Sequence, residues 1–218
     1  RNGGKGLFLE SLNNGGWDRP EYIRSGEQML ELVELEPFQK GWLAATWPDQ
    51  AGFFGDGKCA MAFMGNWMYG AQASNSASGE GLGDSNMGMF NMPMTNGGLG
   101  DSGDTLGGIN GWLFSSSASD AAVELMMHYI SLDIQKEDAS NGAYIPIVKG
   151  ADGSLTNPFL QQVAKNISSS EYHQIFYDQF LGADIGRVVN DVSTDLAAGI
   201  ISAEEATQAV QEAWEFNQ

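Results

Sequence analysis

Two asparagine and tryptophan pairs are the residues of this chain best suited to binding chemistry. Asn66 directly precedes Trp67, and Asn110 lies two residues before Trp112. Sugars offer C–H faces that stack on aromatic rings and hydroxyls that need planar polar partners, so each pair suits a saccharide. Gly108 and Asn110 would add backbone amides close to the ligand. The alternative is that both tryptophans fill the core; Trp67 follows a turn and is the stronger candidate, whereas Trp112 falls in an expected strand.

A second polar and aromatic cluster lies between two expected helices. Tyr177, Asp178 and Gln179 supply an aromatic ring, a carboxylate and an amide in succession. This combination suits the binding of hydroxyl groups, and a solvated loop is the alternative. Tyr144, close to Pro146, either lines the same cleft or braces it.

Two groups of residues raise the possibility of metal binding, but ordinary structure explains both better. Alternation in a buried strand explains the methionines as well as a copper(I) site does, and no neighbouring cysteine or paired histidine supports a metal. Asp101, Ser102 and Asp104 resemble part of a calcium loop, but the closing glutamate of an EF-hand is absent. The sequence therefore predicts no metal. The methionines concerned are Met87, Met89, Met92 and Met94.

The catalytic motifs of common enzymes are missing from the sequence. The chain has no G-x-S-x-G elbow, no P-loop and no G-x-G-x-x-G between strand and helix. His128 and His173 lie far apart, and neither belongs to a metal motif. We therefore expect no cofactor and no catalysis. A glycoside-active enzyme remains the alternative, because carboxylates are abundant.

The composition is that of an acidic globular protein. The 218 residues are 42% hydrophobic, and 28 acidic against 10 basic residues give a formal charge of −18. This charge repels nucleic acid and anionic membrane surfaces, which are excluded as partners. No apolar run approaches the roughly 20 residues that span a bilayer. The single cysteine, Cys59, lies in an apolar run and is expected to be a buried, inert thiol.

The order of expected elements indicates an α/β fold with mainly parallel strands. Proline and polar caps mark helix starts, and short apolar runs between turn residues mark strands. Helices are expected from Asp18–Pro20, from Pro48 to Gly55, over 67–73, over 119–133 with a continuation to Gly142, from Asn157–Pro158, over 185–199 and from Ser202, where Glu205 completes a capping box. Strands are expected over 59–64, 87–93, from Gly107 through Trp112, and over 144–148.

Several motifs together resemble one family. The pattern F-x-x-G-x-x-A-M-x-x-x-G-x-W occupies 54–67, and it is followed by a GG-x-N-G-W segment at 107–112 and a G-x-x-I-P return at 142–146. Asn157–Pro158 then opens a helix, and the segment 196–206 resembles a closing l-x-x-G-x-x-s-x-e-e-a pattern. In this order the motifs resemble the extracellular solute-binding proteins of ABC sugar importers (family 1, maltose-binding-protein-like). The resemblance covers nearly all of the chain, as the C-terminal portion of such a protein.

The resemblance implies a type II periplasmic-binding-protein-like fold of two lobes that close on a sugar. Residues 1–94 and 143–218 would belong to the second lobe, 106–142 to the first, and 95–105 would be the hinge crossing. Most of the first lobe would be missing; Arg1 begins no signal peptide, so a front portion is expected to have been removed.

The same resemblance implies a function outside the cytoplasm. The protein would be periplasmic or a cell-surface lipoprotein, would bind a mono- or oligosaccharide, and would deliver it to an ABC transporter permease. In the family the tryptophan at the position of Trp67 stacks on the sugar. The partners implied are the sugar, the permease and the missing N-terminal portion of the same protein.

Overall fold

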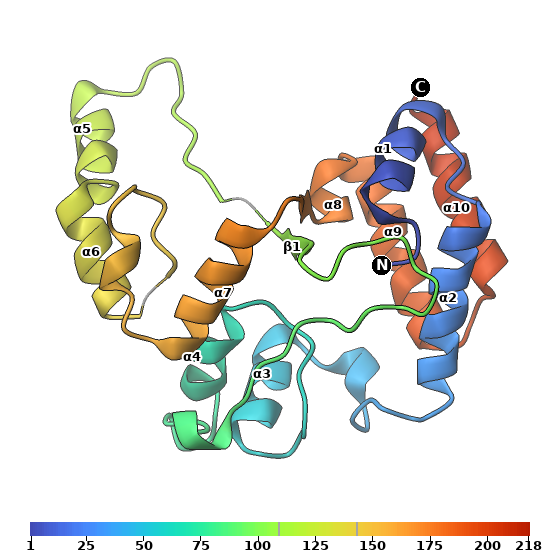
Figure 1. The fold of residues 1–218 in the computed structure, drawn as a ribbon, viewed down its shortest axis with the longest axis horizontal. Coiled ribbons are helices and arrows are strands. Elements are labelled where there is room, and N and C mark those ends of the chain that lie inside the picture. Colours follow the sequence, from blue (N-terminus) through green and yellow to red (C-terminus); the bar gives the residue numbers. More distant parts are fainter. Residues whose placement is uncertain (109, 143) are drawn as a thin grey trace. The chain divides into compact units, whose positions relative to one another are not determined.

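The computed structural model describes residues 1–108, 110–142 and 144–218. It is a helix-rich α/β structure (Figure 1). The chain forms two compact units: the first comprises 1–44, 91–108 and 171–218, and the second 45–90 and 109–170. The assignment of segments to two lobes of a larger protein stays a prediction. Within the described ranges, no helix is both long and apolar enough to cross a membrane.

The first unit combines helices with a short parallel sheet. Strand β1 pairs with β2 in the register Thr105↔His173, and Thr105 Oγ1 lies 2.8 Å from His173 Nδ1. Helix α10 packs against both α9 and α2, as the blue and red ribbons of Figure 1 show. The elements of this unit are α1 (Gly4–Asn14), α2 (Pro20–Val33), η1 (Trp42–Ala44), β1 (Thr105–Gly107), β2 (His173–Ile175), α8 (Tyr177–Phe180), α9 (Ala183–Ala197) and α10 (Ala203–Phe216).

Local sequence signals explain where α2 and α10 begin and why they approach closely. Pro20 occupies the first turn of α2, and Ser202 and Glu205 form the predicted capping box of α10. Gly26 on α2 faces Ala203, whose Cβ would lie 2.8 Å from a Cβ added at Gly26. A glycine is therefore required for this contact. Asp18, the predicted helix start, lies one residue before Arg19, where the structure places the N-cap.

An aromatic cluster forms the core of the first unit beside α1. Phe8 stacks on Tyr177 with ring centroids 4.8 Å apart, and Trp17 lies 5.9 Å from Phe8 and 5.3 Å from Tyr22. Phe180 completes the cluster at 5.8 Å from Phe8. Aromatic pairs at these separations stabilise a fold beyond the area they bury. The cluster ties α8 to α1 and to the turn before α2.

Alkaline pH is expected to destabilise the first unit through Tyr177. Burial, together with the nearby Tyr22, raises the pKa of the Tyr177 hydroxyl above its ordinary value. Above about pH 10 the tyrosine of the unfolded chain releases its proton, while Tyr177 of the folded chain retains it. The free energy of unfolding therefore falls as the pH rises above about 10. Circular dichroism against pH should show a shallower alkaline loss for Tyr177→Phe. Identical alkaline profiles for the variant and the wild type would contradict this assignment.

The second unit is built from helices around a small core. Ala139, Leu155 and Leu160 are buried together, with Ile145 and Ala164 packed against them. Figure 1 draws its elements from cyan to orange. They are α3 (Trp47–Gly55), α4 (Met68–Ser74), η2 (Asp84–Asn86), α5 (Asp120–Tyr129), α6 (Leu132–Ser140), η3 (Asp152–Ser154) and α7 (Pro158–Ser169).

Capping signals again set the helix bounds of the second unit. Asn157 Oδ1 accepts hydrogen bonds from the Phe159 and Leu160 backbone amides at 2.9 and 3.1 Å, which confirms the predicted start of α7. The single helix predicted over 119–133 is instead two helices. The first ends at Tyr129, and Ser131 becomes the N-cap of the second.

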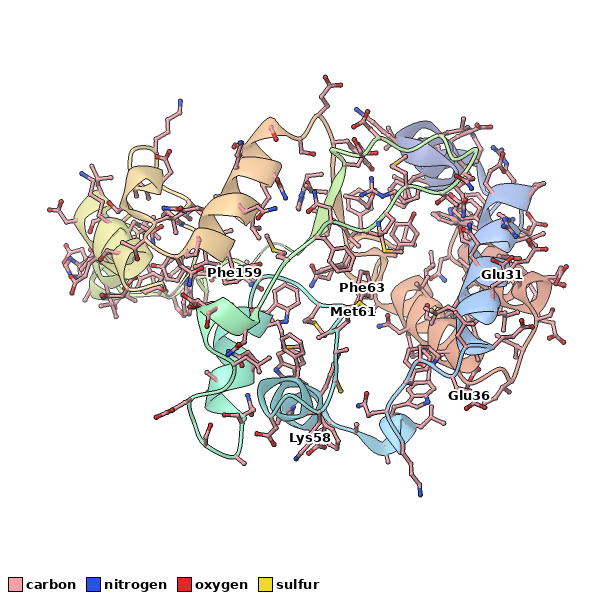
Figure 2. All side chains as sticks on the ribbon, turned by 60° about the horizontal axis from the view of Figure 1, so that its bottom comes forward. Glu31, Glu36, Lys58, Met61, Phe63 and Phe159 are labelled. Carbon is pink, nitrogen blue, oxygen red and sulfur yellow. The ribbon has the colours of Figure 1, made fainter. Side chains whose placement is uncertain are left out.

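The predicted strands at 59–64, 87–93 and 144–148 are wrong for this structure, in which these segments are not in a hydrogen-bonded strand. The strand expected from Gly107 through Trp112 instead ends at Gly107, as β1. Met61 and Phe63, labelled in Figure 2, are 72% and 80% exposed, so the first segment is not a buried strand. Cys59 is only partly buried. A strand requires a hydrogen-bonded neighbour, which an apolar run alone does not supply.

Candidate functional site

The carboxyl ends of β1 and β2 bring two predicted site residues into one neighbourhood. The Phe176 amide donates to Gly107 O at 3.1 Å, and α8 begins at the next residue. A Cβ added at Gly108 would lie 3.1 Å from Gln179 Oε1, so glycine lets this side chain approach the strand end. Ligands of parallel sheets bind outside the carboxyl ends of the strands. The structure therefore places Gly108 and α8, which carries Asp178, where a ligand site is expected.

Within the cluster 177–179 the three side chains have different roles. Tyr177 belongs to the aromatic core, whereas Asp178 and Gln179 are exposed. Asp178 Oδ2 accepts a long hydrogen bond of 3.4 Å from Asn190 Nδ2. The exposed carboxylate and amide are the groups of this cluster that can contact a hydroxylated ligand.

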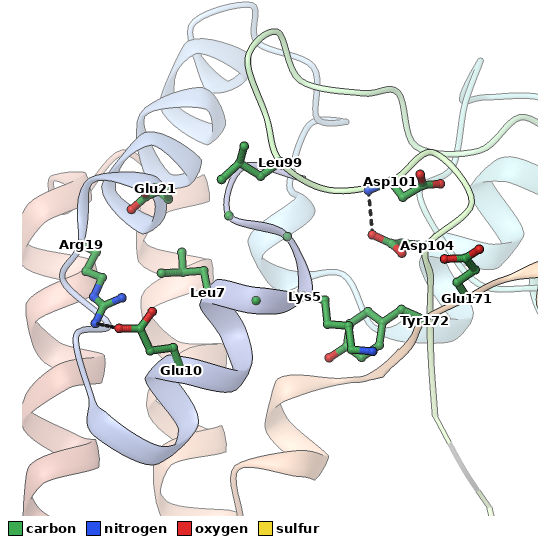
Figure 3. Close-up of a pocket in the computed structure, with 13 residues that line it drawn as sticks. Lys5, Leu7, Glu10, Arg19, Glu21, Leu99, Asp101, Asp104, Glu171 and Tyr172 are labelled. Carbon is green, nitrogen blue, oxygen red and sulfur yellow. Dashed lines mark hydrogen bonds and ion pairs between the residues drawn. The ribbon is translucent and has the colours of Figure 1, made fainter.

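A hollow of about 570 Å³ opens between four segments of the first unit (Figure 3). Five carboxylates and two cations line it, together with the Tyr172 ring and the glycine-rich start of α1. No local sequence pattern indicates this hollow, because its walls come from segments distant in the chain. Its lining residues are Gly3, Gly4, Lys5, Gly6, Leu7, Glu10, Arg19, Glu21, Leu99, Asp101, Asp104, Glu171 and Tyr172.

The charges in this hollow are partly paired. Arg19 Nη2 lies 2.8 Å from Glu10 Oε1, and this hydrogen bond lowers the pKa of the Glu10 carboxyl. Lys5 Nζ lies 5.2 Å from the centre of the Tyr172 ring, within cation–π distance. The remaining excess of carboxylates would repel an anionic ligand and accept hydrogen bonds from the hydroxyls of a neutral one.

The loop 101–104, which resembles part of a calcium loop in sequence, forms one wall of the hollow. Asp101 Oδ1 accepts from the Gly103 amide at 2.7 Å, and Asp104 Oδ2 accepts from the Asp101 amide at 2.8 Å. These bonds are those of a self-capped turn. Among the described residues, no group of histidine, cysteine and carboxylate side chains is arranged to hold a metal ion.

In the second unit, Asn66 and Trp67 lie at the start of α4. Trp67 occupies the N-cap position and is 46% exposed, and its ring folds back over Gly65. The next residue, Met68, is buried. The structure thus presents part of the Trp67 ring to solvent, as a stacking residue requires.

Trp112 and Tyr144 are linked through an aromatic residue that the sequence did not single out. Tyr129 meets Trp112 edge-on with ring centroids 6.2 Å apart, and lies 6.5 Å from Tyr144. Trp112 is 66% exposed and Asn110 is exposed. Tyr129 is the last residue of α5, and no binding motif surrounds it in the sequence.

The hydroxyl of Tyr144 is used within the protein. It donates to Asp138 and accepts from Gln135 Nε2 at 2.7 Å, while Gln135 Oε1 accepts from the Ile147 amide at 3.0 Å. Burial and the Asp138 carboxylate raise the pKa of Tyr144. These contacts favour the bracing role of Tyr144, and leave its ring as the part available to a ligand.

Replacing Gln135 with leucine is expected to destabilise the second unit by about 1 to 3 kcal/mol, because the Ile147 amide and the Tyr144 hydroxyl would each lose a partner. Gln135 is 1% exposed, so water cannot replace its amide. Urea unfolding should show the lower stability. Gln162→Leu, on the exposed side of α7, is the matched control and should change little. Equal unfolding midpoints for the two variants would contradict the bracing network.

Two solved structures share this fold. One comes from biochemical and structural work on xylan utilization by the thermophilic bacterium Caldanaerobius polysaccharolyticus; it matches 97% of this chain at 20% identity with a TM-score of 0.78. The other is a chitin oligosaccharide binding protein, which matches 95% of this chain at 20% identity with a TM-score of 0.73. This chain spans 55% and 52% of their lengths. No family model and no curated protein matches the sequence.

Proposed function

We propose that this chain binds a carbohydrate and delivers it to the permease of an ABC transporter. The observation that carries the proposal is the fold shared over 95% of the chain with a chitin oligosaccharide binding protein. The acceptor-rich hollow of the first unit and the half-exposed Trp67 add the polar and stacking groups that sugars require. The protein would belong to the family 1 solute-binding proteins and would perform no chemistry on its ligand.

The proposed mechanism is closure of two lobes on the sugar. In the first unit, Asp178 would accept hydrogen bonds from sugar hydroxyls at the strand ends, and the Gln179 amide could both accept and donate. In the second unit, Trp67 would offer a ring face on which a sugar can stack. Closure excludes water from these contacts, and the closed form would be the one that the permease recognises. Such a protein acts outside the cytoplasm, in the periplasm or as a cell-surface lipoprotein.

The second partner proposed is an N-terminal portion of the same protein. The two solved structures contain much additional chain, and this one covers only 55% and 52% of them. The exposed apolar side chains of Met61, Phe63 and Trp112 support this part of the proposal, because a covering partner would remove their apolar surface from water.

Calorimetry with chitin and xylan oligosaccharides tests the binding function. We expect a saturable heat with at least one oligosaccharide and unchanged sugar on chromatography afterwards. A glucuronic acid oligomer is the matched ligand control and should bind more weakly, because the hollow carries excess negative charge. Released product would instead support a glycoside-active enzyme, and absence of heat across the whole series would contradict carbohydrate binding.

Native mass measurement tests the N-terminal partner. We expect sugar binding by a species heavier than the 23.4 kDa of this chain. A monomer of 23.4 kDa that binds sugar by itself would contradict this part of the proposal and leave the binding function intact.

A further inference from the structure

Three polar atoms in the core of the first unit have no hydrogen-bond partner among the described residues. They are Ser11 Oγ, Trp17 Nε1 and the hydroxyl of Tyr22. Ser11 is 0% exposed and Trp17 is 2% exposed, so bulk water does not reach them. Buried polar groups in folded proteins are almost always paired, directly or through an ordered water molecule.

The three residues come from adjacent elements that pack together. Trp17 lies in the turn between α1 and α2, with its ring 5.3 Å from that of Tyr22 on α2 and 5.9 Å from that of Phe8 on α1. Ser11 lies three residues after Phe8, on the same side of α1. The Ser11 hydroxyl also faces Tyr22 closely enough to lower the pKa of the Tyr22 hydroxyl, although burial has the larger effect and raises it.

The donor and acceptor types of these atoms are complementary to one water molecule. The indole N–H can only donate, whereas each hydroxyl can donate or accept. A water molecule can accept from Trp17 Nε1 and exchange hydrogen bonds with both hydroxyls, which gives it the three bonds typical of buried water. None of the three residues lines the acid-lined hollow, so these polar atoms are separate from the candidate sugar site.

We infer that the first unit contains an internal water-binding site formed by Ser11, Trp17 and Tyr22. The water joins α1, the turn at 15–19 and α2 beneath the Phe8 and Tyr177 rings. The water therefore helps to hold the aromatic residues that pack against α8. This role does not depend on which ligand the protein binds.

The sign of the stability change on removing one hydroxyl separates a bridged site from unpaired groups. Tyr22→Phe and Ser11→Ala each delete a hydroxyl and add nothing. With bridging water, each variant is expected to lower the folding equilibrium constant about fivefold, because a hydrogen bond is lost. Alanine is the better helix former, so a loss at Ser11 is not a helix-propensity effect. Exposed Ser116→Ala is the matched control and should be neutral.

Unchanged or higher stability of both variants would overturn the inference, since removing an unpaired buried hydroxyl relieves a cost. A high-resolution crystal structure of the wild-type chain gives an independent measurement. We expect one water oxygen within about 3.2 Å of at least two of the three atoms. Density without a water molecule there, or an indole N–H paired with a protein carbonyl, would equally overturn it.

Discussion

Replacing Trp17 with alanine is expected to cost about 3 to 5 kcal/mol of the free energy of unfolding, the range for deletion of a large buried aromatic side chain. Trp17 is nearly fully buried and lies within 6.1 Å of the Phe8, Tyr22 and Tyr177 rings. Its loss opens a cavity between α1, α2 and α8, whose rings all contact Trp17. Urea unfolding followed by circular dichroism should show a large drop in the transition midpoint.

Trp47→Ala is the matched control for this experiment. Trp47 begins α3 in the second unit and is 39% exposed, so its removal should cost far less. Because the two variants delete the same side chain, a similar fall in both midpoints would show that burial of Trp17 does not govern stability. If burial of Trp17 governs stability, hydrogen exchange should speed up in α1, α2 and α8 for Trp17→Ala and not for Trp47→Ala.

The helices were predictable because their signals are local. The Asn157 and Pro158 start of α7 and the capping box at Ser202 each depend on residues within one turn, and the structure confirms them. The break between α5 and α6 was missed because Ser131 can serve either as a helix residue or as an N-cap, and the apolar period continues through it.

The strands were not predictable in the same way, because pairing is nonlocal. An apolar run such as 59–64 becomes a strand only when another segment supplies hydrogen bonds to its backbone. The strand pair that did form, β1 with β2, joins residues 68 positions apart (Thr105 and His173), and β2 carries no apolar run that could have indicated it.

In the candidate site, too, single residues were predictable from local signals, whereas their arrangement in space was not. Sequence singled out Gly108 and Asp178 for separate reasons, and only the fold places Gly108 against α8. The acid-lined hollow combines the start of α1 with the loop at 99–104 and with Tyr172, so no local pattern could have revealed it. For Tyr144 the sequence left lining and bracing open, and its hydroxyl contacts with Asp138 and Gln135 favour bracing.

Trp67→Ala is expected to weaken carbohydrate binding by about 1 to 3 kcal/mol while leaving the fold intact, a range typical of aromatic binding contacts. This expectation rests on the proposed function. Because nearly half of the Trp67 surface is exposed, the ring can contribute to a ligand contact without supporting the core. Calorimetry with the best-binding oligosaccharide measures the affinity, and urea unfolding measures the fold.

Two further variants separate stacking from packing. Trp67→Phe keeps an aromatic face and should recover part of the lost affinity, whereas Trp47→Ala removes a comparably exposed tryptophan from α3 and should leave affinity unchanged. Loss of stability in Trp67→Ala to the extent expected for Trp17→Ala would instead assign Trp67 to the core. Full affinity in a folded Trp67→Ala protein would remove this residue from the site, and the search for the stacking ring would move to Trp112, whose exposed face adjoins Tyr129.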